Sequence, residues 1–191
     1  MSMQSNDGDK LLIDRAQGGD KSAFEALVRK YQDRVYNICR YMLGPADAED
    51  AAQDSFVKAY RNISAFTPSP GFCAWVTRIT INTCLDYKRR PRHLPLARSS
   101  SEGDEYDLDE PFSGPGPEDL LASRQAGAVV EQAILRLSEK LRASLVLHEI
   151  EGFSYEEMAS ALGISIGTVK SRLFRAREEL KKLLDSAREH L

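Results

Sequence analysis

The chain contains no run of about 18 apolar residues, which a membrane-spanning helix would require. Its first ten residues, MSMQSNDGDK, hold no hydrophobic signal-peptide core. Cysteine is scarce, since Cys39, Cys73 and Cys84 are odd in number, far apart and without a C-x-x-C pair. These absences argue against a membrane span, a secreted chain, a disulfide framework and a zinc site. They predict free buried thiols, no metal and a cytoplasmic location.

The sequence also lacks the motifs of several enzyme classes. No Gly-rich phosphate-binding loop is present, and His93, His148 and His190 are isolated from one another. The stretch HEIEG at His148 has Gly152 where a zinc protease motif places its second histidine. We therefore expect no catalytic residue, no cofactor and a protein that is not an enzyme.

What the chain does have is charge that is strongly segregated along its 191 residues, behind a net charge of only -3. Residues 99–119 hold eight acidic residues and no basic one, together with three prolines and three glycines. Such a segment cannot bury enough apolar surface to fold alone, so we expect a flexible linker. Residues 78–98 just before it hold six basic residues and one acidic residue. Two small domains on either side of the linker are therefore favoured over one large domain.

Apolar residues at helical spacing predict three helices before the linker, over 22–43, 47–63 and 72–90. The first ends at Gly44-Pro45 and the third follows a turn at 68–71. The second has four acidic residues and no basic one in its first two turns, and its expected inner side is Ala51, Ala52, Phe56, Ala59 and Tyr60. Either the helix dipole or an acidic docking surface explains that charge. The third helix has Trp75, which suits a core position better than a base-stacking platform, and a densely basic end.

After the linker, the stretch 154–180 has the pattern of a helix-turn-helix. Ser154 and Glu157 form a capping box, Gly163 can end the first helix, and Ser165 can cap the second. The second helix has a buried stripe and an opposite polar face, with four basic residues and no acid over 165–177. The stripe consists of Val169, Leu173, Ala176, Leu180 and Leu183. A basic helix after a short Gly-containing turn favours insertion into the DNA major groove, although a solvated basic face has the same composition.

Taken in order, these segments resemble the extracytoplasmic-function (ECF) class of bacterial sigma factors in the sigma-70 family. The resemblance rests on AQGGDKSAFEALVRKYQDRVYNICRYMLG, DAEDAAQDSFVKAYRNI, FCAWVTRITINTCLDYKRR and LHEIEGFSYEEMASALGISIGTVKSRLFRAREEL, which span nearly the whole chain. It implies an all-α protein of two small helical domains joined by an acidic flexible linker. The implied divisions are an N-terminal extension (1–19), a region 2 domain (20–95), the linker (96–117) and a region 4 helix-turn-helix domain (118–191).

The resemblance also implies the function and its residues. A sigma factor binds core RNA polymerase, at the coiled coil of the largest subunit and at the flap, and directs it to promoter DNA, commonly under an anti-sigma factor. The implied polymerase-binding residues are Asp47, Asp50, Gln53, Asp54 and Phe56. The implied minus-ten DNA residues are Arg78, Asn82, Lys88, Arg89 and Arg90. The implied minus-thirty-five residues are Lys170, Ser171, Phe174 and Arg175 at base edges, with Thr168, Arg172 and Arg177 nearer phosphates.

One alternative function stays open from the sequence. A helix-turn-helix regulator could bind duplex DNA without being a polymerase subunit. It would need a dimer face or a receiver domain, and no alternating strand pattern of a receiver domain is visible. Co-elution with core polymerase would distinguish the two.

Overall fold

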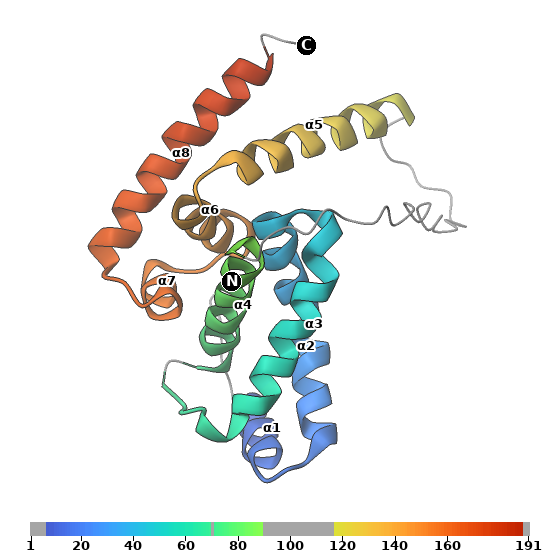
Figure 1. The fold of residues 1–191 in the computed structure, drawn as a ribbon, viewed down its shortest axis with the longest axis vertical. Coiled ribbons are helices and arrows are strands. Elements are labelled where there is room, and N and C mark those ends of the chain that lie inside the picture. Colours follow the sequence, from blue (N-terminus) through green and yellow to red (C-terminus); the bar gives the residue numbers. More distant parts are fainter. Residues whose placement is uncertain (1–6, 70, 90–116, 189–191) are drawn as a thin grey trace.

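The described residues fold into helices, and within each unit these are joined by short connections (Figure 1). The computed structural model describes residues 7–69, 71–89 and 117–188, and these contain no β-strand. The N-terminal unit comprises α1 (Asp7–Gln17), α2 (Lys21–Leu43), α3 (Pro45–Asn62), η1 (Ile63–Ala65) and α4 (Phe72–Arg89). The C-terminal unit comprises α5 (Pro117–Arg136), α6 (Glu139–Leu145), the π-helical turn η2 (Val146–Ile150), α7 (Tyr155–Leu162) and α8 (Ile166–Arg188). The all-α fold with two helical regions is confirmed.

Two sequence predictions fall on parts that the structure does not describe. Arg90 and residues 96–116 of the expected linker lie outside the described residues. Within the described ranges, no helix combines the length and apolarity of a bilayer span. The segment 1–19 contains α1, which packs on α2 with Ile13 and Ala16 buried.

Local capping explains where α2 begins. Asp20 accepts the backbone N–H groups of Ser22 and Ala23 at 2.9 and 3.2 Å, and the Arg15 guanidinium donates to its other oxygen at 2.6 Å. The Ser22 hydroxyl also donates to Asp20 at 2.7 Å, and this bond, followed by those from Arg15 and the Ala23 N–H, holds the pKa of Asp20 well below its usual range. The apolar stripe that follows is buried as its spacing predicts, with Leu27 and Val35 wholly inaccessible.

A single glycine forms the corner between α2 and α3. Gly44 is both the C-cap of α2 and the N-cap of α3, with φ 94° and ψ 168°. This positive φ favours glycine, and Pro45 supplies a first helical residue that needs no backbone donor. Ala51, Ala52 and Ala59 then face inward on α3 as expected. The expectation for Tyr60 is wrong, because it is 40% exposed and touches Phe24 only by its ring edge.

Aromatic rings fill the base of the N-terminal unit. Phe66 and Phe72 stand edge to face at 5.8 Å, Trp75 lies 5.2 Å from Phe66, and Tyr31 lies 5.3 Å from Phe72. Trp75 is therefore a half-buried member of this cluster, in agreement with the core position that its helical spacing favoured. Cys39, Cys73 and Cys84 are free and buried, which confirms the prediction of unpaired thiols.

The C-terminal unit is organised around one buried arginine. The Arg142 guanidinium donates to the carbonyls of Ile134 and Leu137 at 3.0 and 2.8 Å, to that of Leu135, and across the units to Met42 at 2.6 Å. The carbonyls of Ile134, Leu135 and Met42 belong to the last turns of α5 and α2, where intrahelical donors run out, and Leu137 directly follows α5. Arg142 is only 2% exposed, and its burial lowers its pKa.

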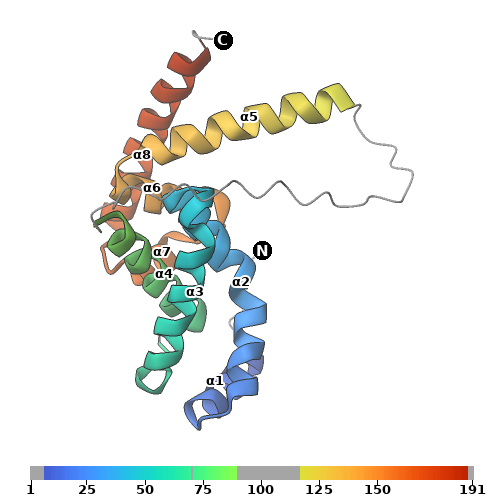
Figure 2. The same cartoon turned by 45° about the vertical axis from the view of Figure 1, so that its right-hand side comes forward.

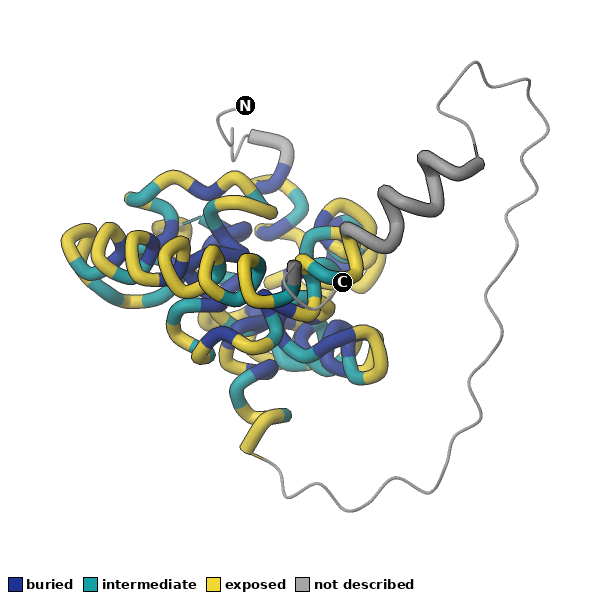
Figure 3. Tube along the Cα trace, turned by 90° about the horizontal axis from the view of Figure 1, so that it is seen from above, coloured by how far each residue is buried: buried dark blue, intermediate teal, exposed yellow. Residues whose placement is uncertain are grey.

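The two units pack against each other. α7 contacts α4, while α5, α6 and η2 contact α2 (Figures 1 and 2). Buried positions gather where these helices meet and exposed ones lie on the outside (Figure 3). An outer surface of α3 in the N-terminal unit and one of α8 in the C-terminal unit therefore stay exposed.

Candidate functional site

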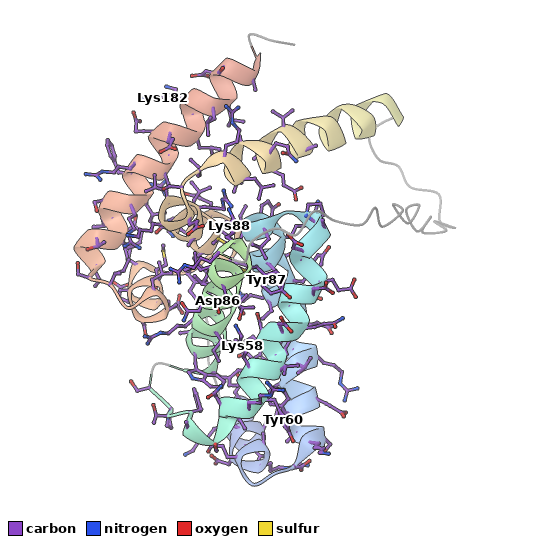
Figure 4. All side chains as sticks on the ribbon, viewed as in Figure 1. Lys58, Tyr60, Asp86, Tyr87, Lys88 and Lys182 are labelled. Carbon is purple, nitrogen blue, oxygen red and sulfur yellow. The ribbon has the colours of Figure 1, made fainter. Side chains whose placement is uncertain are left out.

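The acidic turns of α3 present only some of their side chains to solvent. Asp50 and Gln53 are exposed, whereas Asp47, Asp54 and Phe56 are half-buried. The Asp54 carboxylate accepts the hydroxyl of Tyr87 at 2.8 Å and so holds α4 against α3. Lys58 and Asp86, 3.1 Å apart, join the same two helices (Figure 4). The predicted polymerase-binding set is therefore divided between an outward surface and a helix contact.

A groove of about 420 Å³ runs between α2 and α3 beside Asp50 and Gln53. Its apolar lining is Val28, Tyr36, Ala52 and Phe56, and its polar lining is Gln32, Asp33, Glu49 and Gln53. Sequence reasoning predicted Gln53 and Phe56 here but missed the four residues from α2. These four residues form the α2 side of the groove, where Tyr36 is 39% exposed although it is an aromatic residue on an amphipathic helix.

On α4, three of the predicted minus-ten residues share one outer face. Arg78, Asn82 and Arg89 are exposed, and at about 100° per residue they lie within roughly 40° of one another. Lys88 is exposed on a different side, where it lines a second cavity of about 370 Å³ with Tyr87, Glu139 and Arg142. The opposite side of α4 is core, since Thr80 and Thr83 are buried and donate to carbonyls one turn back at 2.9 Å.

The predicted helix-turn-helix is present with the expected local geometry. Ser154 accepts the N–H of Glu157 at 3.2 Å, and the Glu157 carboxylate accepts the N–H of Ser154 at 2.8 Å. Gly163 ends α7 in the left-handed region, with φ 64° and ψ 40°. Ser165 then accepts the N–H of Thr168 at 3.1 Å, which caps the first turn of α8. Each of these bonds satisfies a backbone group that a helix end would otherwise leave without a partner.

The two faces of α8 are separated as the spacing predicts. Val169, Leu173 and Ala176 are at most 1% exposed, whereas Leu180 and Leu183 of the predicted stripe are only half-buried. Lys170, Ser171, Phe174 and Arg175 are exposed, while Thr168 and Arg172 are half-buried at the edges. Phe174 is 67% exposed, which is unusual for an aromatic ring, and it lies among polar and cationic neighbours on the same face. The outer face of α8 therefore combines positive charge, hydroxyl groups and one apolar ring.

An acidic residue from another element contacts this face. The Glu149 carboxylate on η2 accepts from Nε and Nη2 of Arg177 at 2.8 and 2.6 Å, and this bond raises the pKa of Arg177. The ring of Tyr155 lies 5.9 Å from Lys170 Nζ and 5.1 Å from the His148 ring. Sequence reasoning missed Glu149 because its partner is 28 residues away.

Comparison with known proteins assigns the family. Residues 27–93 match sigma-70 region 2, and residues 128–180 match sigma-70 region 4. The RNA polymerase sigma-H factor of Pseudomonas aeruginosa is 38% identical over 95% of this chain and 96% of that protein. The ECF RNA polymerase sigma-E factor of Escherichia coli K12 is 35% identical over 90% and 92%. The chain belongs to the ECF sigma factors of the sigma-70 family.

Solved structures agree with the fold of this sigma factor. The structure of CnrH in complex with the cytosolic domain of CnrY matches with a TM-score of 0.70 and 30% identity, over 94% of this chain and 99% of that one. Neither unit alone makes up half of the chain, so a score this high requires similar placement of both units. RpoE in complex with the anti-sigma factor NepR from Bartonella quintana has the same fold, with a TM-score of 0.61 and 24% identity.

The sigma factor also brings its two predicted DNA-binding units together. A Cβ atom at Gly163, in the turn of the helix-turn-helix, would lie 4.0 Å from Nη2 of Arg78 on α4. The turn and the α4 face thus lie next to each other, although they are 85 residues apart in the sequence. No spacing within either helix predicts this proximity.

Proposed function

We propose that this ECF sigma factor, acting in the cytoplasm, binds core RNA polymerase through the groove between α2 and α3. The observation that carries the proposal is the groove itself, with an apolar floor of Val28, Ala52 and Phe56 and acidic rim residues Asp33 and Glu49. An apolar floor with a charged rim suits an amphipathic helical segment of opposite charge. In this proposal that segment is the coiled coil of the largest polymerase subunit, as the family resemblance implies.

Asp50 extends the acidic surface beyond the groove and Gln53 lines the groove, so both join the proposed docking site. Asp54 has a different role in the proposal. Its carboxylate is engaged by Tyr87 at 2.8 Å, so it positions α4 rather than meeting the polymerase directly. Asp47, half-buried beside the cavity that Lys88 and Arg142 also line, is likewise a poor candidate for direct polymerase contact.

We further propose that α8 contacts the minus-thirty-five element and α4 the minus-ten element. Lys170, Ser171 and Arg175 can donate to base edges, and the exposed Phe174 ring can contact a thymine methyl group. Thr168 lies in the first turn of α8, where backbone N–H groups favour a phosphate. Arg78, Asn82 and Arg89 form the corresponding face of α4. These roles are binding roles, and no catalytic residue is proposed.

We propose in addition that an anti-sigma factor controls the activity of this sigma factor. Two structures similar to this chain, CnrH and RpoE, were solved in complex with the CnrY cytosolic domain and the anti-sigma factor NepR, respectively. An anti-sigma factor that covers the α2–α3 groove or the α8 face would prevent polymerase or promoter binding.

Charge reversal tests the docking groove. The variant carrying Glu49→Lys and Asp50→Lys places two positive charges at the rim, and we expect it to bind core polymerase at least roughly tenfold more weakly, because like charges across an interface cost several kcal/mol. Asp14→Lys, on an exposed position of α1, is the matched control. Unchanged affinity of the double variant in a direct binding titration would remove the groove from the proposal.

Base recognition by α8 needs a separate test. Arg175→Ala should lose preference at one promoter position, by about 1 to 3 kcal/mol, because a bidentate contact discriminates among bases by that amount. Lys181→Ala, exposed further along α8, is the control and should not change the preference profile. The assay is a selection of promoter variants with reconstituted holoenzyme. A profile of Arg175→Ala identical to that of the parent would contradict the assignment.

A further inference from the structure

Two cysteine side chains meet inside the core of the N-terminal unit. Cys39 on α2 and Cys84 on α4 have their sulfur atoms 3.7 Å apart, and the Cys84 thiol donates to the Cys39 sulfur. The two residues are 45 positions apart in the sequence, and both side chains are wholly inaccessible to solvent. The packing of α2 against α4 therefore brings two reduced thiols into contact.

The third cysteine lies on the same helix but away from this pair. Cys73 precedes Cys84 by three turns of α4, which is about 16 Å along the helix at 1.5 Å per residue. Its sulfur accepts from Nη1 of Arg34 at 3.0 Å, and its side chain is 1% exposed. Cys73 is therefore almost as deeply buried as the other two cysteines, and it serves as an internal control for chemistry that requires two adjacent thiols.

The pair already has much of the geometry that a disulfide requires. An S–S bond is about 2.05 Å long, so the two sulfurs need to approach by roughly 1.7 Å in total. Small rotations about the two Cα–Cβ bonds supply such a movement at a modest cost in strain. Because the core holds α2 and α4 together, each thiol meets the other at an effective concentration far above that of a thiol in solution. The pair is thus prearranged for one particular covalent bond.

Burial determines which oxidant can react with the pair. The hydrogen-bonded Cys84 thiol and burial raise the pKa of Cys39, and Ser55 on α3 opposes part of that rise. Thiolates react with oxidants and thiols do not, so the raised pKa makes the reaction slow. The inaccessible sulfurs also exclude a large disulfide reagent from the folded chain. Hydrogen peroxide is scarcely larger than water, so it can enter during local fluctuations of the core.

We propose that hydrogen peroxide converts Cys39 and Cys84 into a disulfide, which cross-links α2 to α4 inside the folded N-terminal unit. The cross-link lies behind two surfaces of the proposed function, since Cys39 is one turn from Tyr36 of the docking groove and Cys84 is two residues from Asn82. It closes a loop of 45 residues, so it restricts the unfolded chain and favours the folded unit. Oxidising conditions would therefore stabilise the unit that carries both surfaces.

The reaction takes two steps. Cys39 reacts first, because Ser55 beside it favours its thiolate. The Cys39 sulfur attacks one peroxide oxygen, the O–O bond breaks, a sulfenic acid forms, and the other oxygen leaves as water with the thiol proton. The Cys84 sulfur then attacks the sulfenic sulfur, the S–O bond breaks, and a second water leaves. The two sulfurs together lose two electrons and two protons, and one peroxide is reduced to two waters.

Alkylation and mass spectrometry of the full-length protein test the bond. The folded chain is treated with hydrogen peroxide, unfolded and alkylated, and the disulfide form should take one alkyl group where the untreated form takes three. Trypsin should release the peptide 35–40 joined to the peptide 79–88, while the peptide 62–78 stays alkylated at Cys73. The linked product should be lost in Cys39→Ala and kept in Cys73→Ala.

The size of the oxidant tests where the bond forms. Hydrogen peroxide and oxidised glutathione are compared on the folded chain and on the chain unfolded in urea. The ratio of the peroxide rate to the glutathione rate should be at least roughly tenfold higher for the folded chain, because burial excludes only the larger reagent. This comparison uses the parent protein, so it does not depend on the folding of any variant.

Thermal unfolding tests the stabilisation. The oxidised parent should melt roughly 5 to 10 °C above the reduced parent, because the closed loop limits the freedom of its unfolded state. Cys73→Ala should show the same difference between its oxidised and reduced forms. Cys84→Ala should show none.

Each part of the proposal has a result that would overturn it. Three alkyl groups after peroxide treatment, or a linked peptide that contains Cys73, would overturn the pairing of Cys39 with Cys84. Equal rate ratios for the folded and unfolded chains would overturn closure inside the folded unit. A linked product without a rise in Tm would overturn the stabilisation. None of these measurements involves core polymerase or promoter DNA, so the proposed docking and promoter contacts stand or fall separately.

Discussion

Replacement of Arg142 by methionine should destabilise the C-terminal unit more than any change on its surface. The side chain is 2% exposed and donates to four backbone carbonyls at or just after the C-terminal ends of α5 and α2. Methionine fills a similar volume but donates nothing. The perturbation therefore isolates the capping bonds from the packing.

The expected loss of stability follows from the backbone carbonyls that would lose their donor. The Ile134 carbonyl also accepts the N–H of Leu137 at 3.1 Å, so losing the bond from Arg142 costs little there. Each buried carbonyl left without a donor costs about 1 to 3 kcal/mol, and relief of the buried charge offsets part of the sum. We expect a net loss of about 3 to 4 kcal/mol, which corresponds to a fall of roughly 10 °C in Tm for a chain of this size.

Thermal unfolding followed by circular dichroism measures this. Arg136→Met, on an exposed position in the last turn of α5, is the matched control and should change stability by no more than about 0.5 kcal/mol. Arg142→Lys keeps the charge with three donors on one atom, so it should lie between the two. If Arg142→Met melts within about 3 °C of Arg136→Met, the capping role assigned to Arg142 is wrong.

Three further outcomes are expected. Glu149→Gln should release Arg177 and raise affinity for all duplex sequences alike, with a salt dependence steeper by roughly one unit; an unchanged slope in salt titrations would contradict this. Ser154→Ala removes half of the capping box and should lower stability by about 1 kcal/mol in thermal melts, while Ser160→Ala within α7 serves as the comparison. The depressed pKa of Asp20 means that its contribution to stability is fully present above its ordinary pKa of about 3.9 and is lost progressively as the pH falls from there toward the lowered pKa of the folded state. Asp20→Asn should therefore flatten the acid limb of a pH–stability curve, and an unaltered limb would argue against that contribution.

Local features of the sequence were enough to predict α2, α3 and α4 of the N-terminal unit and the helix-turn-helix, but not α1, which lies in the segment expected to be an extension. The bounds follow from caps and breakers such as Gly44, Ser154 and Gly163, whose effects act within one turn. The buried stripe of α8 follows in the same way, because helical spacing fixes which residues share a face. Family resemblance supplied the function, which the comparisons confirm, and the residue roles, which stay predictions.

Contacts between distant residues could not be predicted. Asp50 and Asp54 look alike in the sequence, yet only Asp54 has Tyr87 as a partner, 33 residues away. Arg34 and Glu151 are 117 residues apart, and nothing in the spacing of either helix identifies the other. Periodicity states that a side chain faces inward or outward, but the partner it meets depends on the packing of whole helices.

The corner at Gly44 makes the docking groove sensitive to a residue far from it. Phe56 lies twelve residues beyond the corner, about 18 Å along α3 at 1.5 Å per residue. A rotation of only 10° about Gly44 would therefore displace the far wall of the groove by roughly 3 Å, about the diameter of a water molecule. A side chain at this position would have to adopt a positive φ, and its Cβ would lie 3.6 Å from Cδ1 of Leu135 on α5. The width of the surface that we propose for polymerase docking thus depends on a backbone dihedral at the seam between the two units, so a partner that shifts α5 could adjust it without touching the groove.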